Sequence, residues 1–256
     1  MLSRAGFRHA FFTRLGGVSL PPFDALNFLA AVGDAALSVA ENRRRAAAYL
    51  GIESSRLYFL SQVHGTAARE LWGDEDWDSV VSSTGDITLS KVAGVGCGVR
   101  SADCVPVLIA DRKSGAVSAV HSGWKGTVAR AAAMGVMALK RLLGGQGDWV
   151  AAIGPHIERC CFEVGPDVAE ALKQASPLGE KAIFEGSPQQ QSDKKAKADL
   201  RAIVRAQLVE AGVGDESIED VAGCTMCNPN LFFSYRRDGA KSGRLLSAIV
   251  AGRGGA

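Results

Sequence analysis

The sequence predicts an α/β fold, with a single domain over residues 1–256 built on mixed β-sheets. Short valine-rich runs bounded by turn residues, which are typical of buried strands, alternate with longer segments of helical periodicity. These elements do not follow a strict strand–helix–strand repeat, which favours mixed sheets. With 256 residues, 47% of them apolar, the chain can form one large core or two small ones. No internal repeat or shift in composition marks a domain boundary.

The first third of the chain contains two predicted strands and one predicted helix. Phe7–Thr13 is expected to be a strand, and a loop rich in glycine and proline follows it. Ser38–Leu50 has apolar residues at near-helical spacing, with Gly51 as its stop. Leu57–Val63 is a further apolar run. Asp74–Ser83 is acidic, and we expect it to be irregular.

A glycine-rich segment, Gly94–Val99, resembles a phosphate-binding loop at first sight. The third glycine of a G-x-G-x-x-G pattern would fall at Val99, and the chain has no G-x-x-x-x-G-K-[ST] sequence. We therefore interpret the segment as a strand that another backbone approaches closely. A further strand is expected to start within Gly85–Leu89.

The centre of the sequence predicts a β-hairpin. Two apolar runs, Val105–Ala110 and Ala116–Val120, flank a polar turn at Asp111–Gly115. Five-residue connections that contain glycine commonly join antiparallel strands. Cys104 comes directly before the first strand and His121 directly after the second. Pairing of the strands would therefore bring these two side chains to the same end of the hairpin.

The rest of the chain alternates between predicted helices and strands. Helical periodicity and end signals predict three helices, and short apolar runs predict two strands. The polar segment Gln189–Lys197 is expected to be an exposed or mobile loop. The predicted elements are a helix within Val128–Leu143, a strand at Asp148–Ile153, helices at Pro166–Ala175 and Asp199–Ala211, and a last strand at Leu245–Ala251.

Three side chains at strand edges suggest a metal site. His64 follows an apolar run, and it joins Cys104 and His121 as a third candidate ligand. One thiolate and two imidazoles suit a zinc ion that keeps its fourth position open. Asp103 and Asp111 are candidates to orient a ligating imidazole, and the sequence does not decide between them.

Composition favours chemistry on small molecules. The formal net charge is +2, with 29 basic and 27 acidic residues, and gives no electrostatic signature of nucleic-acid binding or of an anionic membrane surface. No run reaches the roughly 18 apolar residues of a membrane span. Six cysteines in 256 residues are too few for a disulfide scaffold, so we expect reduced thiols and a cytoplasmic protein.

The motifs together resemble the laccase-domain family, long labelled multicopper polyphenol oxidases, some of whose bacterial members are called peptidoglycan editing factors. The resemblance runs from about Phe11 to Arg244. Ser122 and Lys125 differ from the alanine and arginine that are common in the family. The motifs are SQVHG, SADCVPVLIAD, AVHSGWKGT, AAIGPHIERCCFEVG and FFSYRRDGAKSGR, preceded by FFTRLGGVS and ENRR.

The resemblance implies a fold, a cofactor and an activity. The expected fold is an α/β/β/α layered arrangement similar to the catalytic domain of cytotoxic necrotizing factor. The implied zinc ligands fall on His64, Cys104 and His121. The implied activity is that of a zinc-dependent purine nucleoside phosphorylase acting on adenosine, inosine or methylthioadenosine, with adenosine deaminase activity as an addition. The sequence does not choose between these substrates and a peptidoglycan precursor.

Phosphorolysis would need cations to hold phosphate while it attacks the ribose. Arg43, Arg236 and Arg244 are the candidates, because a guanidinium can grip two phosphate oxygens at once. Cys104, His121 and Asp103 are the candidate catalytic residues. The expected partners are therefore a purine nucleoside and phosphate, with no nucleic acid and no membrane.

Three alternatives remain open at the level of sequence. A copper-dependent polyphenol oxidase would need many imidazoles, and the chain has four histidines, so copper is expected only as an adventitious metal. A Cys–His hydrolase or amidase would use Cys104 as nucleophile and His121 as base. A cytidine-deaminase-like zinc site would combine His156-Ile157-Glu158 with Cys224 and Cys227, but Gly223 stands where that signature has proline.

Overall fold

Two β-sheets lie face to face in the computed structural model, which describes residues 1–185 and 195–252. The larger sheet has six strands in the order β12-β8-β6-β7-β4-β3. Its outer pairs, β12–β8 and β3–β4, are parallel and its inner pairs are antiparallel, so the sheet is mixed as predicted. Its strands are β3 (Ala68–Glu70), β4 (Ile87–Ser90), β6 (Val105–Asp111), β7 (Val117–Ser122), β8 (Trp149–Ile153) and β12 (Ile218–Asp220).

The smaller facing sheet has the order β1-β13-β5-β2. Its edge strand β1 comes from the N-terminal segment and pairs with β13, the last strand of the chain, which places Phe11 opposite Ser247. Gly98 lies in β5, where an added Cβ would be 3.2 Å from the Tyr58 carbonyl oxygen. The close backbone approach predicted for the glycine-rich segment is confirmed. The strands are β1 (His9–Phe11), β2 (Leu57–Tyr58), β5 (Gly96–Ser101) and β13 (Leu245–Val250).

Strand β6 shows why the central apolar run has no polar alternation. Every residue of β6 is buried, because the sheet is covered on both faces. Leu108 packs toward β5 and β13 in the core between the two sheets. Val107 and Ile109 point the other way, into the core shared with the helices. Alternate side chains of one strand therefore serve two different cores.

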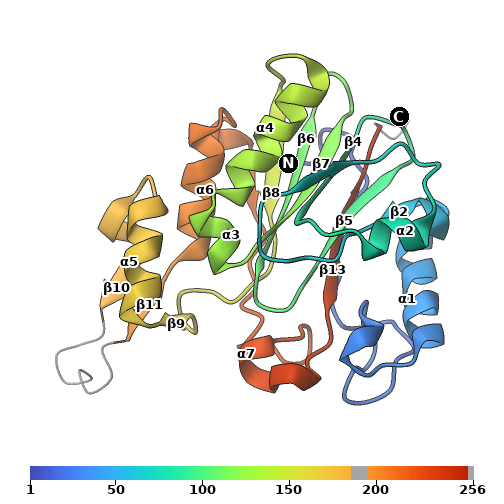
Figure 1. Ribbon diagram of the computed structural model, residues 1–256, viewed down its shortest axis with the longest axis horizontal. Coiled ribbons are helices and arrows are strands. Elements are labelled where there is room, and N and C mark those ends of the chain that lie inside the picture. Colours follow the sequence, from blue (N-terminus) through green and yellow to red (C-terminus); the bar gives the residue numbers. More distant parts are fainter. Residues whose placement is uncertain (186–194, 253–256) are drawn as a thin grey trace.

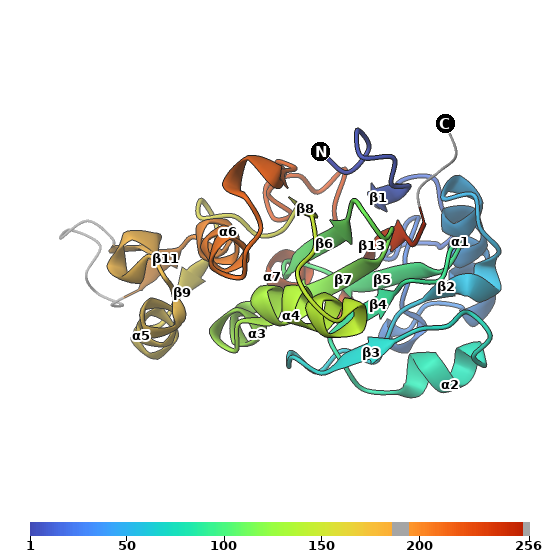
Figure 2. The same cartoon turned by 90° about the horizontal axis from the view of Figure 1, so that it is seen from above.

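Helices cover the outer faces of both sheets (Figures 1 and 2). On the larger sheet, α4 lies very close to β7, because a Cβ added at Gly135 would be 2.5 Å from Cγ2 of Val120. On the smaller sheet, Ala47 and Leu50 at the end of α1 pack against Leu246 of β13. The helices are α1 (Ala36–Tyr49), α2 (Trp77–Ser82), α3 (Trp124–Val128), α4 (Ala131–Leu143), α5 (Pro166–Ala175), α6 (Leu200–Glu210) and α7 (Tyr235–Asp238).

The predicted α/β/β/α layering of mixed sheets is confirmed by this arrangement. A third, small antiparallel sheet was not foreseen and carries part of the segment expected to be a loop. Ala196 and Lys197 lie in its central strand, whereas residues 189–194 lie outside the described residues. Its strands are β9 (Glu163–Val164), β10 (Ile183–Glu185) and β11 (Ala196–Ala198).

The helix predicted within Val128–Leu143 is confirmed as α4 and ends before Gly144, but it begins only at Ala131, because Arg130 has a left-handed φ of 62° that separates it from α3. One further expectation was wrong. The segment expected to be irregular, Asp74–Ser83, contains α2, whose first turn is capped by the Asp76 carboxylate at 2.8 Å from the Ser79 amide.

Candidate active site

His64, Cys104 and His121 come together at one end of the central hairpin. Their potential ligand atoms all lie within 4.8 Å of one another, and the two imidazole rings are 5.0 Å apart between centroids. The register of β6 and β7 pairs Pro106 with His121, which places Cys104 at the same end of the hairpin. His121 lies inside β7 rather than after it, and His64 lies in the loop that follows β2.

Asp86 is the carboxylate that orients both histidine-bearing segments. His121 Nδ1 donates to Asp86 Oδ1 at 2.8 Å, which leaves Nε2 as the ring nitrogen available to a metal. The backbone amides of His64 and Gly65 donate to the same carboxylate at 2.9 and 2.7 Å, and a third bond comes from Val63. Asp86 is fully buried. Sequence reasoning missed this residue, because only the pairing of β4 with β7 brings it beside His121.

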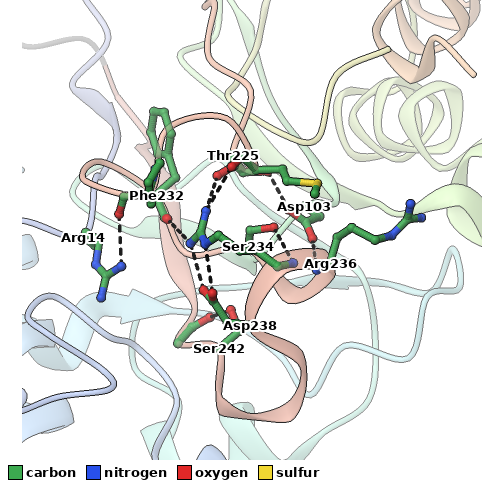
Figure 3. A network of polar contacts seen from close by, with 12 residues as sticks. Arg14, Asp103, Thr225, Phe232, Ser234, Arg236, Asp238 and Ser242 are labelled. Carbon is green, nitrogen blue, oxygen red and sulfur yellow. Dashed lines mark hydrogen bonds and ion pairs between the residues drawn. The ribbon is translucent and has the colours of Figure 1, made fainter. Parts of the chain in front are cut away.

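Neither of the two aspartates named from the sequence contacts an imidazole. Asp111 holds the turn at the opposite end of the hairpin, where it accepts from the Ser114 and Asp148 amides. Asp103 accepts from the Thr225 hydroxyl and from the Arg236 backbone amide, both at 2.6 Å (Figure 3). The expectation that one of them orients a ligating histidine was wrong, because their side chains are used by neighbouring loops.

The thiol and the buried imidazole form a charged pair. Burial opposes ionisation of Cys104, but the charge and hydrogen bonds of His121 and His64 lower its pKa to about 6. Burial likewise opposes protonation of His121, yet Cys104 and Asp86 raise its pKa to about 9. Cys104 is therefore a thiolate near neutral pH, which is the form that binds a metal or attacks as a nucleophile.

A glycine is required beside this cluster. A Cβ added at Gly123 would lie 2.8 Å from Cys104 Sγ and 2.9 Å from a ring carbon of His64. Gly123 precedes α3 and follows β7 directly, so the chain turns against the cluster as it leaves the sheet. The sequence analysis quoted this glycine within a motif and gave it no role.

The cluster opens into a cavity of about 740 Å³, within the range of small-molecule sites. Its walls combine the three potential ligands with aromatic and basic side chains. The lining residues are Leu29, Ser61, Gln62, His64, Arg100, Ser101, Ala102, Asp103, Cys104, His121, Gly123, Trp124, Lys125, Ile157, Phe162, Leu200, Tyr235, Arg236 and Arg244.

Of the arginines named from the sequence, Arg236 and Arg244 line this cavity. Arg244 Nη1 donates to the carbonyl oxygens of Ser242 and Gly243 at 2.7 and 3.0 Å. Among the described residues, no hydrogen-bond or ion-pair partner contacts its Nε or Nη2. The Arg244 guanidinium is therefore held on one side and has donors left for a ligand.

Arg236 and Arg100 also donate hydrogen bonds to backbone carbonyl oxygens. Arg236 Nη2 donates to the Glu163 carbonyl at 3.0 Å. Arg100 donates to the carbonyl oxygens of Phe28 and Leu60. Burial, assisted by the nearby charge of Arg244, lowers the Arg100 pKa to about 10. Arg100 and Lys125 were not foreseen as cavity residues.

Arg43 is not part of this group. Its guanidinium lies 3.5 Å from the ring centroid of Trp77, where α1 meets α2, and it does not line the cavity. The expectation that Arg43 binds substrate in this site is therefore wrong. The arginine run in α1 gave no signal that one of its members would turn inward against Trp77.

The cytidine-deaminase-like site does not form among the described residues. His156 Nδ1 donates to the Gly154 carbonyl at 2.8 Å, and Glu158 pairs with Arg201 at 2.9 Å. Cys224 and Cys227 are grouped with two other cysteines rather than with His156. His9 also lies outside the cluster of His64 and His121.

The donor set at the cavity fits a transition metal. A thiolate and two imidazoles, one of them fixed through its second nitrogen by a buried carboxylate, match the ligand types of catalytic zinc sites with three protein ligands.

No helix among the described residues is long and apolar enough to cross a membrane.

Comparison with known proteins agrees with the motif analysis. The family model described as multi-copper polyphenol oxidoreductase laccase matches residues 8–252. A purine nucleoside phosphorylase from Deinococcus radiodurans is 37% identical over 245 residues, which cover 94% of this chain and 88% of that protein. The adenosine deaminase RL5 from an unknown prokaryotic organism is 36% identical over 235 residues, covering 89% of this chain and 87% of that protein.

The fold is shared with solved structures. The crystal structure of YlmD from Geobacillus stearothermophilus superposes with a TM-score of 0.88 at 33% sequence identity, and the match covers 96% of this chain and 92% of that one. The structure of a hypothetical protein YfiH from Bacillus licheniformis gives the same TM-score at 30% identity, with coverage of 95% and 92%.

Proposed function

The chain belongs to the multi-copper polyphenol oxidoreductase laccase family, and from this premise we propose that it is a purine nucleoside phosphorylase whose site holds zinc. Its 37% identity to the Deinococcus radiodurans phosphorylase supports this assignment over the oxidase that the family description suggests. The cluster of His64, Cys104 and His121 supplies a site for one ion.

One observation carries the proposal. A single cavity contains both the thiolate–imidazole cluster and the Arg244 guanidinium, whose Nε and Nη2 have no partner among the described residues. A guanidinium with unpaired donors suits a phosphate, because these donors can contact two phosphate oxygens at once. Arg100 and Lys125 add positive charge to the same walls.

The reaction that these residues would support is displacement at the ribose. Phosphate, held by Arg244, attacks the anomeric carbon as the bond to the purine nitrogen breaks, and the purine leaves with the proton that the hydrogen phosphate gives up. Phe162, Trp124 and Tyr235 line the same cavity and offer aromatic faces to the purine. Zinc, when bound by His64, Cys104 and His121, would supply Lewis-acid chemistry.

Phosphate dependence of base release tests the proposal. We expect adenosine or inosine to release base only with inorganic phosphate, and Arg244→Lys to raise the phosphate KM about tenfold, or about 1.4 kcal/mol. A lysine keeps the charge but lacks the planar fork of donors. Arg236→Lys is expected to have a smaller effect, because Arg236 is exposed to solvent whereas Arg244 is partly buried. Arg44→Lys, on the exposed face of α1, is the control.

A second candidate function is hydrolytic deamination of adenosine, favoured by the 36% identity to the adenosine deaminase RL5. Water would attack the amino-bearing carbon of the base and release ammonia. Ammonia release is measured on the same samples, with inosine as the expected product. Ammonia without phosphate dependence in the wild type would replace phosphorolysis by deamination as the proposed activity.

A third candidate is a Cys–His hydrolase or amidase acting on a peptidoglycan precursor. The lowered Cys104 pKa and its contact with His121 give it the features of an activated nucleophile. Metal content separates this candidate from the first two, because a thiolate bound to zinc is not free to attack. Amidase activity that survives full removal of metal, and that alkylation of Cys104 abolishes, would favour it.

A further inference from the structure

We propose that Cys160, Cys161, Cys224 and Cys227 form a second metal site, a structural zinc site separate from the cavity cluster. Their sulfur atoms all lie within 4.8 Å of one another, although two come from the turn after β8 and two from a loop more than 60 residues later. Four thiolates with no open position are the donor set of structural zinc.

The distances between the sulfur atoms fit one bound ion. Cys160 Sγ lies 3.6 Å from the sulfurs of Cys161 and Cys227, and the Cys161 and Cys227 sulfurs are 3.3 Å apart. Sulfur atoms about 2.3 Å from a tetrahedral zinc lie about 3.8 Å from one another. A disulfide would need about 2.05 Å. The four thiolates that hold an iron–sulfur cluster are divided among two or more iron atoms, so the four together are spread further apart than the ligands of one ion.

Both cysteine pairs are presented by tight turns. The Cys161 amide donates to the Glu158 carbonyl at 2.9 Å, which closes the turn that carries Cys160 and Cys161. The Asn228 amide and its side-chain nitrogen both donate to the Cys224 carbonyl, which closes the C-x-x-C turn. The turns are therefore formed by the chain itself, with their sulfurs directed to one point.

Two cations lie against these turns. Lys197 Nζ donates to the Cys160 carbonyl at 2.9 Å. Arg237 Nη1 donates to the carbonyl oxygens of Thr225 and Met226, inside the C-x-x-C turn, at 2.9 and 3.3 Å. Zinc with four thiolates carries a net charge of about −2, which the Lys197 charge partly offsets, whereas the Arg237 charge is shared with the Asp238 carboxylate at 2.8 Å.

A metal ion bound at these four cysteines would stabilise one wall of the cavity. Ile157 and Phe162 flank the first cysteine pair in sequence and line the cavity, and Tyr235 and Arg236 follow the second pair and line it too. A four-cysteine ion between the two turns would hold these wall segments together, and metal bound at a closed site contributes directly to folding free energy. The role is structural, and it does not depend on the reaction in the cavity.

Zinc content tests the proposal. We expect the wild-type chain, purified under reducing conditions without chelator, to lose about one zinc equivalent when Cys224 and Cys227 are both changed to serine. Cys97→Ala is the matched control, because Cys97 is buried in β5 outside both clusters, and its zinc content should equal that of the wild type. The comparison is independent of activity.

Wild-type protein supplies a second measurement if the double variant does not fold. Alkylation with iodoacetamide followed by mass spectrometry should show all four cysteines protected by zinc and modified after chelation. Cobalt in place of zinc should give the absorption of a tetrahedral thiolate site. Equal zinc content in wild type and double variant, alkylation unaffected by zinc, or a Cys161–Cys227 disulfide in freshly reduced protein would overturn the proposal.

Discussion

At the scale of single residues, Asp86 is the side chain on which the cavity cluster depends. The Asp86 carboxylate accepts hydrogen bonds from His121 Nδ1 and from three backbone amides of the loop that carries His64. Burial opposes ionisation of Asp86, yet the hydrogen bonds from His121 and the Gly65 amide keep its pKa below the usual value. A charged carboxylate can thus fix the orientation of two potential ligands that are distant in sequence.

Asp86→Asn is expected to weaken zinc binding in the cavity by about 10–100-fold, because a neutral amide orients His121 less firmly and lowers its basicity as a ligand. Cys104→Ala removes a ligand and should abolish binding. The measurement is zinc competition against a chelator of known affinity.

Asp111→Asn is the matched control for this prediction. Its carboxylate also receives backbone amides, but at the turn on the far end of the same hairpin. Asp111→Asn should leave zinc affinity unchanged even if it lowers stability. Equal losses of affinity in the two variants would contradict the role assigned to Asp86.

Sequence reasoning at this scale succeeded where chain order alone decides proximity. Cys104 precedes the first strand of a hairpin and His121 lies near the end of the second, so their meeting follows from strand pairing. Asp86 could not be predicted, because its position beside His121 depends on which strand pairs with β7, and β4 and β7 are about 30 residues apart in sequence. Asp103 was predicted because it is next to Cys104 in the sequence, but its carboxylate hydrogen-bonds to the hydroxyl of Thr225 instead.

At the scale of elements, α7 forms a cavity wall and is held from behind by an aromatic cluster. Phe233 is buried just before the helix, with Ala102, Phe232 and Leu245. Arg14 from the N-terminal segment stacks on its ring at 4.5 Å. The N-terminal and C-terminal motifs are thus joined in space, as the pairing of β1 with β13 also shows.

Phe233→Ala is expected to destabilise the protein by about 3–5 kcal/mol, because it leaves a cavity behind α7 and removes the surface on which Arg14 stacks. Urea unfolding monitored by circular dichroism measures the loss. Phe184→Ala, at an exposed phenylalanine of β10, is the control and should cost less than about 1 kcal/mol. A loss at Phe233 no larger than at Phe184 would contradict the packing role.

Elements were predictable where local signals were strong. Helix α5 has the predicted bounds, because Pro166 and Asp167 mark its first turn and its apolar face is regular. Helix α2 was missed, since six residues are too few for a periodic pattern. The division between α3 and α4 was missed as well, because arginine at position 130 gives no signal for a left-handed backbone.

At the scale of the whole molecule, the layers agree with those implied by the family resemblance, and the solved relatives share the fold. The likeness to the cytotoxic necrotizing factor domain stays a prediction, as does the single domain over residues 1–256. The packing order of the two sheets could not be derived from periodicity, because β6 and β7 are buried on both faces and carry no polar alternation.

The small number of histidines in the whole chain predicts only weak copper-dependent oxidation of phenols. Four histidines, of which only His64 and His121 meet in a metal-compatible cluster among the described residues, cannot build a multicopper centre in one chain. We expect phenol oxidation only when copper is added, in proportion to the copper bound, because thiolate and imidazole ligands favour copper over zinc. Oxygen uptake with a phenol is the assay. Efficient oxidation by copper-free, zinc-loaded protein would reverse this conclusion.

The Asp103 carboxylate links two parts of the molecule with different tasks (Figure 3). It accepts from the Thr225 hydroxyl, inside the C-x-x-C turn, and from the Arg236 amide on the cavity wall. A ligand that shifts either donor therefore acts on the arrangement of the other, and thermodynamic coupling of this kind is reciprocal. Zinc at the four cysteines is then expected to change the affinity of the cavity for phosphate by the same factor by which phosphate changes the affinity of the cysteines for zinc.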